Sequence, residues 1–533
     1  MTLINTAQLS AISRTSSESH QVYCGLDNAV MLEVLSELHH LRNRPPEIYN
    51  FERALQAPYL EIMNRGFAID ELSRHRAVAE LTARKTHLES ILNELAYAVW
   101  DRPLNPRSPT QLKEFFYSKM RLPEVIIRQK GESKLSTNRE ALEKLDVYLH
   151  ARPIVSLILT IRDISKQLDV FTTEIDTDGR YRTSYNIAGT ETGRPSSSEN
   201  AFGTGGNAQN IAPGLRYVFV ADQGKKLAQI DLEQVEARDV GWFCGVLFND
   251  WTFLDACESG DLHTNNAKRI WRNLEWTGEK HADRQIADRI FYRDFSYRDM
   301  AKRGSHLSNY MGTAWTAGRS LKVPTEIMEE FQARYCRGPS ALSKRLLQQK
   351  PELRDVEPAY PCIAKFWQWI ATEIQTTYSL TTPFGRQRHF FGRPGDDTTL
   401  REAIAFLPQS TTADRMNLGL WKVWKSMPQV ELLAQTYDSI TFQFDERLDE
   451  DAIMEEALSL IRVNLSAPGR PTYIVPGEAK VGWNWGYQVT ESDVERAKLA
   501  GRKIPRLNLD GLAKWKPGGD GRKRHVGLER RIQ

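Results

Sequence analysis

Apolar positions recur at helical spacing through most of the first 170 residues. A helix is expected over residues 26–42, where "LDNAVMLEVLSELHHLR" precedes the Pro-containing boundary "NRPPEIYN". The helical pattern returns between residues 51 and 100, and the turn signal "NRGFAID" at 64–70 divides it into two helices. Another helix is expected around residues 151–170. The N-terminal third is therefore predicted to be mainly helical.

Strand patterns dominate two later segments. "KLAQID" at 226–231 is a short apolar run that ends on Asp231. "ELLAQTYDSITFQFD" at 431–445 predicts a hairpin whose turn carries Asp438. Several helices are expected between these segments, up to about residue 380. The chain is therefore predicted to have a mixed α/β organisation.

The composition is that of a globular protein with more than one domain. With 533 residues, of which 41% are hydrophobic and 26% charged, the chain is too long for one compact core. No apolar run reaches the roughly 20 residues needed to cross a bilayer, so we expect no membrane partner. The first 20 residues lack the basic start and apolar stretch of a secretory signal.

The cysteines indicate a reducing compartment. Five are scattered along the chain without a CxxC pair: Cys24, Cys244, Cys257, Cys336 and Cys362. This spacing argues against a zinc site and favours free thiols. We therefore expect the protein in the cytoplasm.

Positive charge is concentrated at the C-terminus. Residues 496–533 hold twelve Lys and Arg against three Asp and Glu, although the net charge of the whole chain is only +3. Two interpretations stay open for this segment. It is either a solvated terminus or a grip on phosphates that does not depend on base sequence.

Asp231 and Asp438 both follow an apolar approach. If their strands are neighbours, the two carboxylates converge at one edge of a sheet, where they repel unless protonated or bridged by cations. Hard oxygen ligands of this kind suit Mg²⁺, and two such ions can clamp the attacking and leaving oxygens of a nucleotidyl transfer. Taken alone the signal is weak, because most acids at strand ends face solvent.

The segment "RDMAKRGSHLSNYMGT" places Arg298, Lys302, His306 and Tyr310 at four-residue steps. On a helix these side chains form one stripe that begins with two cations and ends with an imidazole and a phenol. That order suits a nucleoside triphosphate, with the phosphates beside the cations. A solvated basic face is the simpler alternative for an Arg and Lys pair.

These residues, in this order, carry a family resemblance. "DLEQVEAR" (231–238), the four-step stripe and "QTYDS" (435–439) resemble the three catalytic motifs of family A DNA polymerases, the DNA polymerase I class, of bacteriophage type. Supporting matches stand in family order: "TGRPSSS", "AQNIAPGLRYVF", "GDLHT", "FGRQR", "LPQSTTAD" and "GWNW". Together they cover roughly residues 50–485, and "NPRSPTQLKEFF" and "LSTNREALEKL" resemble the thumb.

The resemblance implies an α/β right-hand fold of several subdomains, with an antiparallel-sheet palm and mainly helical fingers and thumb. The implied division is an N-terminal remnant (1–50), thumb (51–180), first palm part (181–241), fingers (242–383), second palm part (384–485) and basic tail (486–533).

It also implies roles for single residues. Asp231 and Asp438 are expected to bind two Mg²⁺ ions, with Mn²⁺ as a substitute. Arg298, Lys302 and His263 are expected to hold the incoming dNTP. His306 is expected beside the sugar of the dNTP, and Tyr310 beside the templating base. Glu236 is expected to act as a gate against the ribose 2′-hydroxyl; the alternative is that Glu236 is a surface acid. The residues expected to contact primer–template DNA are Arg194, Gln209, Asn210, Arg401 and Gln409.

The sequence departs from the family pattern inside the site. His306 stands where the family has Phe or Tyr, which puts nucleotide preference in doubt. Tyr437 and Ser439 flank Asp438 where His and Glu are usual, so one acid is missing. Ala405 replaces an Asn. Both metal-binding Asp residues are kept, so catalysis is still expected.

The N-terminus departs most. Too few residues precede the thumb for a 3′–5′ exonuclease domain, yet "YCGLDNAVMLEVL" resembles the last motif of that domain through Tyr23 and Asp27. The segment is either a relic or plain amphipathic helix, or part of an enzyme whose exonuclease is a separate subunit. In either case we expect no proofreading by this chain. A processivity factor is a second candidate partner.

The expected activity is template-directed, primer-dependent DNA synthesis, in phage DNA replication. Two alternatives remain from other classes. A single-subunit RNA polymerase shares the two acids and a similar helix, but Glu236 and the "TGRPSSS" loop favour deoxynucleotides and a primer. A non-catalytic DNA-binding subunit of a split polymerase would account for Ser439, but not for the retained catalytic residues.

Overall fold

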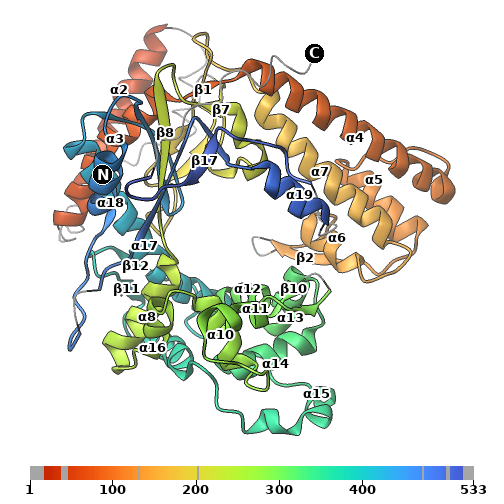
Figure 1. Cartoon of the computed structure of the whole chain (residues 1–533). Coiled ribbons are helices and arrows are strands. Elements are labelled where there is room, and N and C mark those ends of the chain that lie inside the picture. Colours follow the sequence, from red (N-terminus) through yellow and green to blue (C-terminus); the bar gives the residue numbers. More distant parts are fainter. Residues whose placement is uncertain are drawn as a thin grey trace.

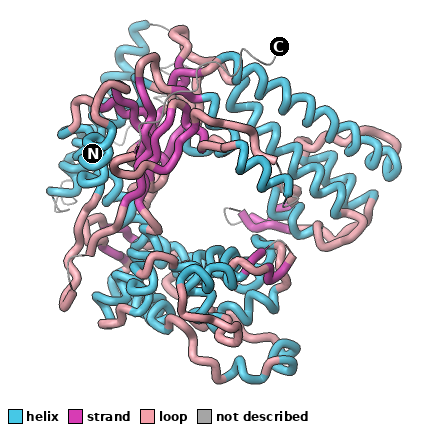
Figure 2. Tube along the Cα trace, in the orientation of Figure 1, coloured by secondary structure: helices cyan, strands magenta, loops and turns pink. Residues whose placement is uncertain are grey.

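The structure is a computed structural model. It describes residues 17–37, 46–129, 132–200, 203–293, 295–470, 473–499 and 504–519. Figure 1 shows three bodies: a twisted sheet at the upper left, an arm of long helices to its right and a helical body below. The trace in Figure 2 shows that strands gather almost entirely in the first body. The predicted strands and most of the predicted helices therefore lie in different bodies of the molecule.

The central feature is a nine-stranded sheet with the order β13-β14-β8-β15-β17-β16-β7-β1-β4. Its strands are β1 (Phe67–Ile69), β4 (Arg180–Tyr181), β7 (Phe219–Val220), β8 (Lys225–Leu232), β13 (Val430–Thr436), β14 (Ser439–Asp445), β15 (Gly477–Gly482), β16 (Asn484–Tyr487) and β17 (Gly511–Lys514). All neighbours pair antiparallel except β16 with β17. The expected antiparallel sheet is present, with one parallel pair.

β8 is an interior strand of this sheet, paired with β14 on one side and β15 on the other, and its apolar side chains are covered on both faces. Leu227, Ala228 and Ile230 are fully buried, which is why the strand has a continuous apolar run rather than strict alternation. β13 and β14 form a hairpin, and β14 pairs with β8 along its whole length. The predicted strand at 226–231 and hairpin at 431–445 are both confirmed.

The arm is built from α4 (Glu71–Trp100), α5 (Pro109–Lys113), the π-helical turn η2 (Glu114–Lys119), α6 (Arg139–Leu145), α7 (Arg152–Thr172) and the hairpin of β2 (Ile126–Gln129) and β3 (Glu132–Leu135). Apolar side chains of α4 and α7 share a separate core, including Leu92, Ile158 and Ile161. Asp70 caps α4 by accepting from two backbone N–H groups, and Ser108 caps α5. The helix predicted around 151–170 is confirmed.

α3 (Pro46–Arg65) does not join the arm's core. Its Leu55, Tyr59 and Ile62 pack in the same core as the strands. Gly66 then turns the chain into β1 with a positive φ, and a Cβ there would lie 2.6 Å from the carbonyl oxygen of Tyr181. The range 51–180 predicted as the thumb therefore begins with a helix that packs on the sheet, and the six predicted ranges stay predictions.

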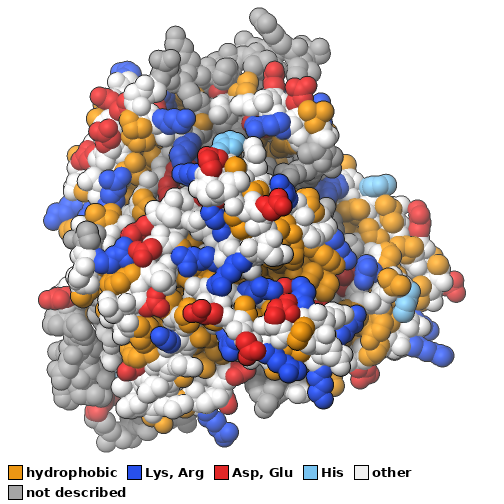
Figure 3. All heavy atoms as spheres, turned by 60° about the horizontal axis from the view of Figure 1, so that its bottom comes forward, with side chains coloured by type: hydrophobic (Ala, Val, Ile, Leu, Met, Phe, Trp, Pro, Cys, Tyr) orange, Lys and Arg blue, Asp and Glu red, His pale blue; other side chains and the backbone are white. Residues whose placement is uncertain are grey.

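The lower body is almost wholly helical. Its elements are α8 (Val235–Phe248), α9 (Thr252–Glu258), α10 (Leu262–Ile270), α11 (Lys280–Ala287), β9 (Ile290–Tyr292), β10 (Phe295–Ser296), α12 (Tyr297–Asn309), α13 (Ala314–Leu321), α14 (Thr325–Tyr335), α15 (Lys344–Gln349), η5 (Pro351–Arg354) and α16 (Pro361–Thr377). The predicted run of helices up to about residue 380 is thus confirmed. Figure 3, in which the lower side of Figure 1 comes forward, shows cations interspersed with acids rather than one basic surface.

The remaining elements of the described part of the chain lie before, between or after these segments. They are α2 (Ser17–Glu37), β5 (Ser184–Asn186), β6 (Ser196–Ser198), η3 (Ala208–Asn210), η4 (Pro213–Val218), β11 (Ser379–Thr381), β12 (Gln387–His389), α17 (Asp397–Ser426), α18 (Glu450–Ile461) and α19 (Glu491–Leu499). The predicted helix at 26–42 agrees with α2 as far as residue 37, and its last residues lie outside the described part. The last residues of the predicted basic tail, 520–533, also lie outside it. Among the described residues no helix is long and apolar enough to cross a membrane.

Candidate active site

Asp231 and Asp438 meet at one end of the central strands. Asp231 lies near the end of β8, and Asp438 follows Tyr437 in the two-residue turn between β13 and β14. The register places Ser439 directly opposite Asp231. The backbone N–H of Leu232 donates to the carbonyl of Asp438 at 3.1 Å, which ties the turn to β8. The sheet therefore holds both acids at the same edge.

The electrostatics of this pair are unfavourable without a cation. Burial and the nearby carboxylate of Asp438 raise the pKa of Asp231 to about 7. Burial also raises the pKa of Asp438, and Glu236 adds to the effect. One carboxylate oxygen of Asp231 (Oδ1) is buried without a hydrogen-bond partner. A buried, unpartnered hard oxygen beside a second carboxylate is a donor set that fits Mg²⁺.

The described residues contain no cluster of three or more His, Cys, Asp or Glu side chains that could hold a metal by themselves. The two acids alone therefore form an open donor set. Such an arrangement suits an ion that keeps waters and takes substrate phosphates as its other ligands. The residues thus fit a site for Mg²⁺ that arrives with a nucleotide better than they fit a closed, structural metal site.

Two charged residues beside the pair were missed from the sequence. Glu478 on β15 is paired across from Asp231, on the side opposite Ser439. The Nζ of Lys480 lies 4.0 Å from Asp231 Oδ2 and 3.2 Å from Glu478 Oε1. The alternation in "GEAKVG" indicates that Glu478 and Lys480 lie on one face of a strand. The sequence does not show that this strand lies beside β8, because that depends on the strand order of the sheet.

The predicted stripe lies on α12. A capping box formed by Ser296 and Asp299 starts this helix, so Arg298 falls in its first turn. Arg298 forms an ion pair with Asp261 at 3.2 Å. Asp261 in turn caps α10, which carries His263 in its first turn. The structure thus brings Arg298 and His263, far apart in the sequence, to neighbouring helix starts.

His263 is held uncharged. Burial, together with the positive charges of Arg298 and Lys302, lowers the pKa of His263 to about 4. Its Nδ1 is buried without a hydrogen-bond partner. The site therefore contains two cations and a neutral imidazole whose ring nitrogen lacks a protein partner.

Glu236 connects Tyr310, at the end of α12, to the loop that contains "TGRPSSS". It lies in the first turn of α8, and its two carboxylate oxygens accept from the hydroxyl of Tyr310 and the guanidinium of Arg194. Tyr310 immediately follows α12, and its ring meets that of His306 edge-on with centroids 5.3 Å apart. These contacts place Glu236 inside the site rather than on the outer surface.

Gln209 and Asn210 lie close to the turn that carries Asp438. The side-chain amide of Gln209 donates to the Pro195 carbonyl at 3.2 Å. The hydroxyl of Tyr437 donates to Asn210 Oδ1 at 3.3 Å. Arg194, Gln209 and Asn210 are therefore connected to the site through the loop and the hairpin.

Arg401 and Gln409 lie on α17 and are not joined to that group. Arg401 pairs with Asp397 one turn earlier, at 3.1 Å. Arg401, Ala405 and Gln409 follow one another at four-residue steps and are all half-buried, so they share one face of the helix. Among the described residues we find no hydrogen bond or ion pair from either Arg401 or Gln409 to another predicted site residue.

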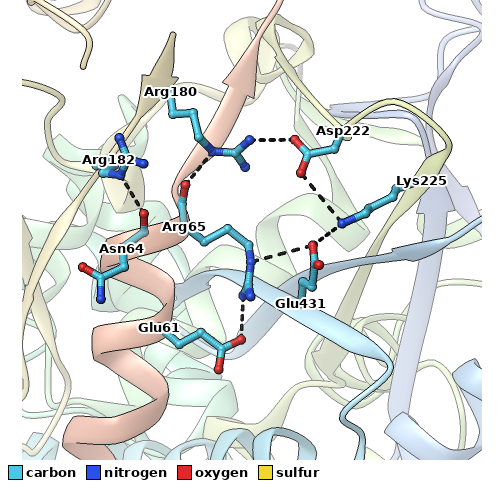
Figure 4. Close-up of a pocket in the computed structure, with 8 residues that line it drawn as sticks. All are labelled: Glu61, Asn64, Arg65, Arg180, Arg182, Asp222, Lys225 and Glu431. Atoms are coloured by element: carbon cyan, nitrogen blue, oxygen red, sulfur yellow. Dashed lines mark hydrogen bonds and ion pairs between the residues drawn. The ribbon is translucent and has the colours of Figure 1, made fainter. Parts of the chain in front are cut away.

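A polar hollow of about 630 Å³ lies elsewhere, at the start of β8. Figure 4 shows its lining side chains: Glu61, Asn64, Arg65, Arg180, Arg182, Asp222, Lys225 and Glu431. Its cations and acids are paired with one another, as between Lys225 and Glu431 at 2.6 Å. This hollow is at the opposite end of the strand from Asp231.

The fold is that of a right-hand nucleic-acid polymerase domain. A solved structure, the POL domain of Pol1 from M. smegmatis in complex with DNA primer-template and dNTP, matches 81% of this chain and 69% of that one, with a TM-score of 0.61 at 20% identity. The expected fold class is therefore confirmed.

The family model for DNA polymerase family A matches residues 75–486, and the chain belongs to this family. DNA polymerase I of Helicobacter pylori is 25% identical over 424 residues, which are 75% of this chain and 40% of that protein. The thermostable DNA polymerase I of Thermus aquaticus is 25% identical over 414 residues, covering 74% and 43%. The chain thus spans about two-fifths of the length of the curated relatives it matches.

Proposed function

We propose that the protein is a DNA-directed DNA polymerase that extends a primer on a DNA template using dNTPs. The observation that carries this proposal is the pair of half-buried carboxylates at one edge of the sheet, Asp231 and Asp438, whose pKa values are both raised in a chain of family A. Neighbouring groups of this kind are stabilised by divalent cations and occur at functional sites.

Asp231 and Asp438 are the residues that hold two Mg²⁺ ions, with Mn²⁺ as a substitute. When bound, such ions activate the attacking primer hydroxyl and stabilise the leaving phosphate oxygens. Arg298 and Lys302 bind the triphosphate and offset the charge that develops on pyrophosphate. Arg298 exchanges its bond to Asp261 for one to phosphate. Neutral His263 contributes a hydrogen bond rather than a charge.

Glu236 selects deoxynucleotides. Because the Tyr310 hydroxyl and the Arg194 guanidinium hold both of its oxygens, the side chain is fixed and cannot swing away from a ribose 2′-hydroxyl. His306, edge-on to Tyr310, lies beside the incoming sugar. The rigid carboxylate then excludes a ribonucleotide by contact and by leaving the extra hydroxyl poorly solvated.

The primer–template is bound through its backbone and minor groove. Arg194, Gln209 and Asn210 contact primer or template near the Asp438 turn, and Arg401 and Gln409 contact primer or template along one face of α17. Contacts of this kind position the duplex without reading its sequence. The biological setting that we propose is phage DNA replication, and a separate exonuclease subunit or a processivity factor stays a prediction from the sequence.

Extension of a labelled primer with Mg²⁺ and dNTPs tests the proposal. Wild type should extend the primer, and Asp438→Asn should not. Asp445→Asn is the matched control, because the same substitution then falls at the far end of β14, where Asp445 pairs with Arg447 on the surface. A parallel reaction with ribonucleotides tests the gate.

Tight DNA binding without extension by wild type would support the non-catalytic alternative. Efficient ribonucleotide use, with no need for a primer, would support the RNA polymerase alternative. Equal extension by wild type and Asp438→Asn would contradict the assigned role of the carboxylate pair.

A further inference from the structure

Lys480 contacts the carboxylate pair from β15. Its ammonium lies 4.0 Å from Asp231 and 3.2 Å from Glu478, and its side chain is only 18% exposed. Lys480 and Glu478 are two residues apart on one strand and therefore project from the same face of the sheet. The lysine is thus a fixed, largely desolvated charge at the edge of the expected metal site.

Glu478 does not need Lys480 for its own neutralisation. Lys514, on β17, reaches Glu478 at 3.0 Å from the next strand. The positive charge of Lys480 acts on Glu478 and also on the acids of the site, where it opposes the burial that raises the pKa of Asp231 and Asp438. The Tyr487 ring, 5.7 Å from the ammonium, covers Lys480 on another side.

A resident ammonium has opposite effects on the two carboxylates and on a metal ion. It compensates part of the negative charge, which keeps Asp231 in place in the resting protein. It also repels a divalent cation twice as strongly as it repels a single positive charge at the same distance. Arriving phosphates bring new negative charge and remove this disadvantage.

We propose that Lys480 is a positioning residue that serves as the counter-charge of Asp231 in the resting protein and keeps its affinity for divalent cations low until a nucleotide binds. This inference rests on the proposed function, because it takes Asp231 and Asp438 as the metal-binding pair.

A Mn²⁺ titration followed by electron paramagnetic resonance tests the proposal. The full chain is used without DNA or nucleotide, at low ionic strength, so that surface charges are little screened. Lys480→Gln and Lys480→Met should each lower the Kd for Mn²⁺ by about fivefold or more, and Lys480→Arg should keep it within about twofold of wild type. Lys514→Gln is the matched control, with a change below about twofold, since Lys514 contacts Glu478 and not Asp231.

Unchanged or weaker Mn²⁺ binding in both neutral variants, with thermal unfolding like that of wild type, overturns the inference. If one neutral variant fails to fold, the other decides. A separate titration of Asp438→Asn distinguishes the two levels of the proposal. If that variant binds Mn²⁺ as wild type does, the ion is not at the carboxylate pair and the assigned metal site fails, whatever Lys480 does.

Discussion

The two ends of β8 hold charged side chains in opposite ways. At its start, Lys225 pairs with Glu431 at 2.6 Å, and the neighbouring Asp222 pairs with Arg180 at 2.8 Å (Figure 4). At its end, Asp231 has one oxygen without a partner and shares its surroundings with a second carboxylate. One end is neutralised by the protein, whereas at the other Lys480 compensates only part of the negative charge, and the rest is left for a ligand to neutralise.

The pKa directions express the same contrast. Partial burial acts to raise the pKa of Asp222, but hydrogen bonds from Arg180 and Gln443 outweigh it, so the pKa is lowered. At Asp231 burial and a like charge act together and raise the pKa to about 7. The acids of the hollow, Asp222 and Glu431, therefore favour their charged form in the fold, whereas Asp231 and Asp438 disfavour it.

The largest expected effect is the loss of activity at the end of β8 that holds Asp231, where the negative charge is only partly compensated. Asp231→Asn should lower primer extension by about three orders of magnitude or more, because a two-ion site loses its shared ligand. The midpoint of thermal unfolding should not fall, since a buried, repelled charge is removed. Extension rate and thermal unfolding, measured on the same preparation, check both halves of this prediction. A variant that is inactive because it is unfolded would not support it.

Substitution of a cation should lower activity at the expected dNTP site, where Arg298 lies on α12, and not at the hollow, where Arg180 lies. Arg298→Ala should lower kcat/KM for dNTPs by about 100-fold, because a charge that stabilises the departing pyrophosphate is lost. Arg180→Ala is the matched control: Arg180 donates to the carbonyls of Arg65 and Gly66 and pairs with Asp222, all within the fold. Its kcat/KM should stay within about threefold of wild type. A large kinetic loss in Arg180→Ala would contradict the distinction.

The pH dependence of stability should have opposite signs at the two ends. The raised pKa of Asp231 means that, between its ordinary value near 4 and about 7, the folded protein binds a proton that the unfolded chain does not. The free energy of unfolding in metal-free buffer should therefore fall as pH rises through this window, by at most about 1.4 kcal/mol per pH unit from this group. Denaturant unfolding at pH 5 and pH 8 measures it.

Asp231→Asn should flatten that dependence, and Mg²⁺ should flatten it in wild type. At the other end the pKa values of Asp222 and Glu431 are lowered, so their stabilisation is present above their ordinary pKa and is lost only as pH falls below it. A wild type that becomes more stable between pH 5 and pH 8, relative to Asp231→Asn, would contradict the assigned repulsion.

Local signals in the sequence were sufficient for the elements and for part of the site. The apolar approach to Asp231 and the hairpin around Asp438 predicted their strands, and the four-residue steps from Arg298 predicted α12. These patterns depend only on backbone periodicity and burial, which act within a few residues.

Contacts between distant segments could not be predicted in this way. Lys480 meets Asp231 because β15 pairs with β8, although almost 250 residues separate them. The resemblance placed residues 51–65 of α3 in the predicted thumb range, and helical periodicity does not say which core Tyr59 enters. β17 enters the sheet between β15 and β16, and the single parallel pair that it forms has no signal in its four residues.

The smallest expected effect tests the compensated end. Glu431→Gln removes the carboxylate that accepts from Lys225 and from the Gln443 side chain, and it leaves the Lys225 ammonium half-buried beside Asp222 at 4.0 Å. Because these groups are partly exposed, the loss of stability should be only about 1 kcal/mol. Primer extension should be unchanged, since five strand residues lie between Lys225 and Asp231. Denaturant unfolding is measured with and without 0.5 M salt, about three times the physiological ionic strength. The difference in stability between wild type and Glu431→Gln should be smaller in salt. A loss of extension without a loss of stability would mean that the two ends of β8 are coupled, and that the ion pairs around Glu431 position the carboxylates as well as the fold.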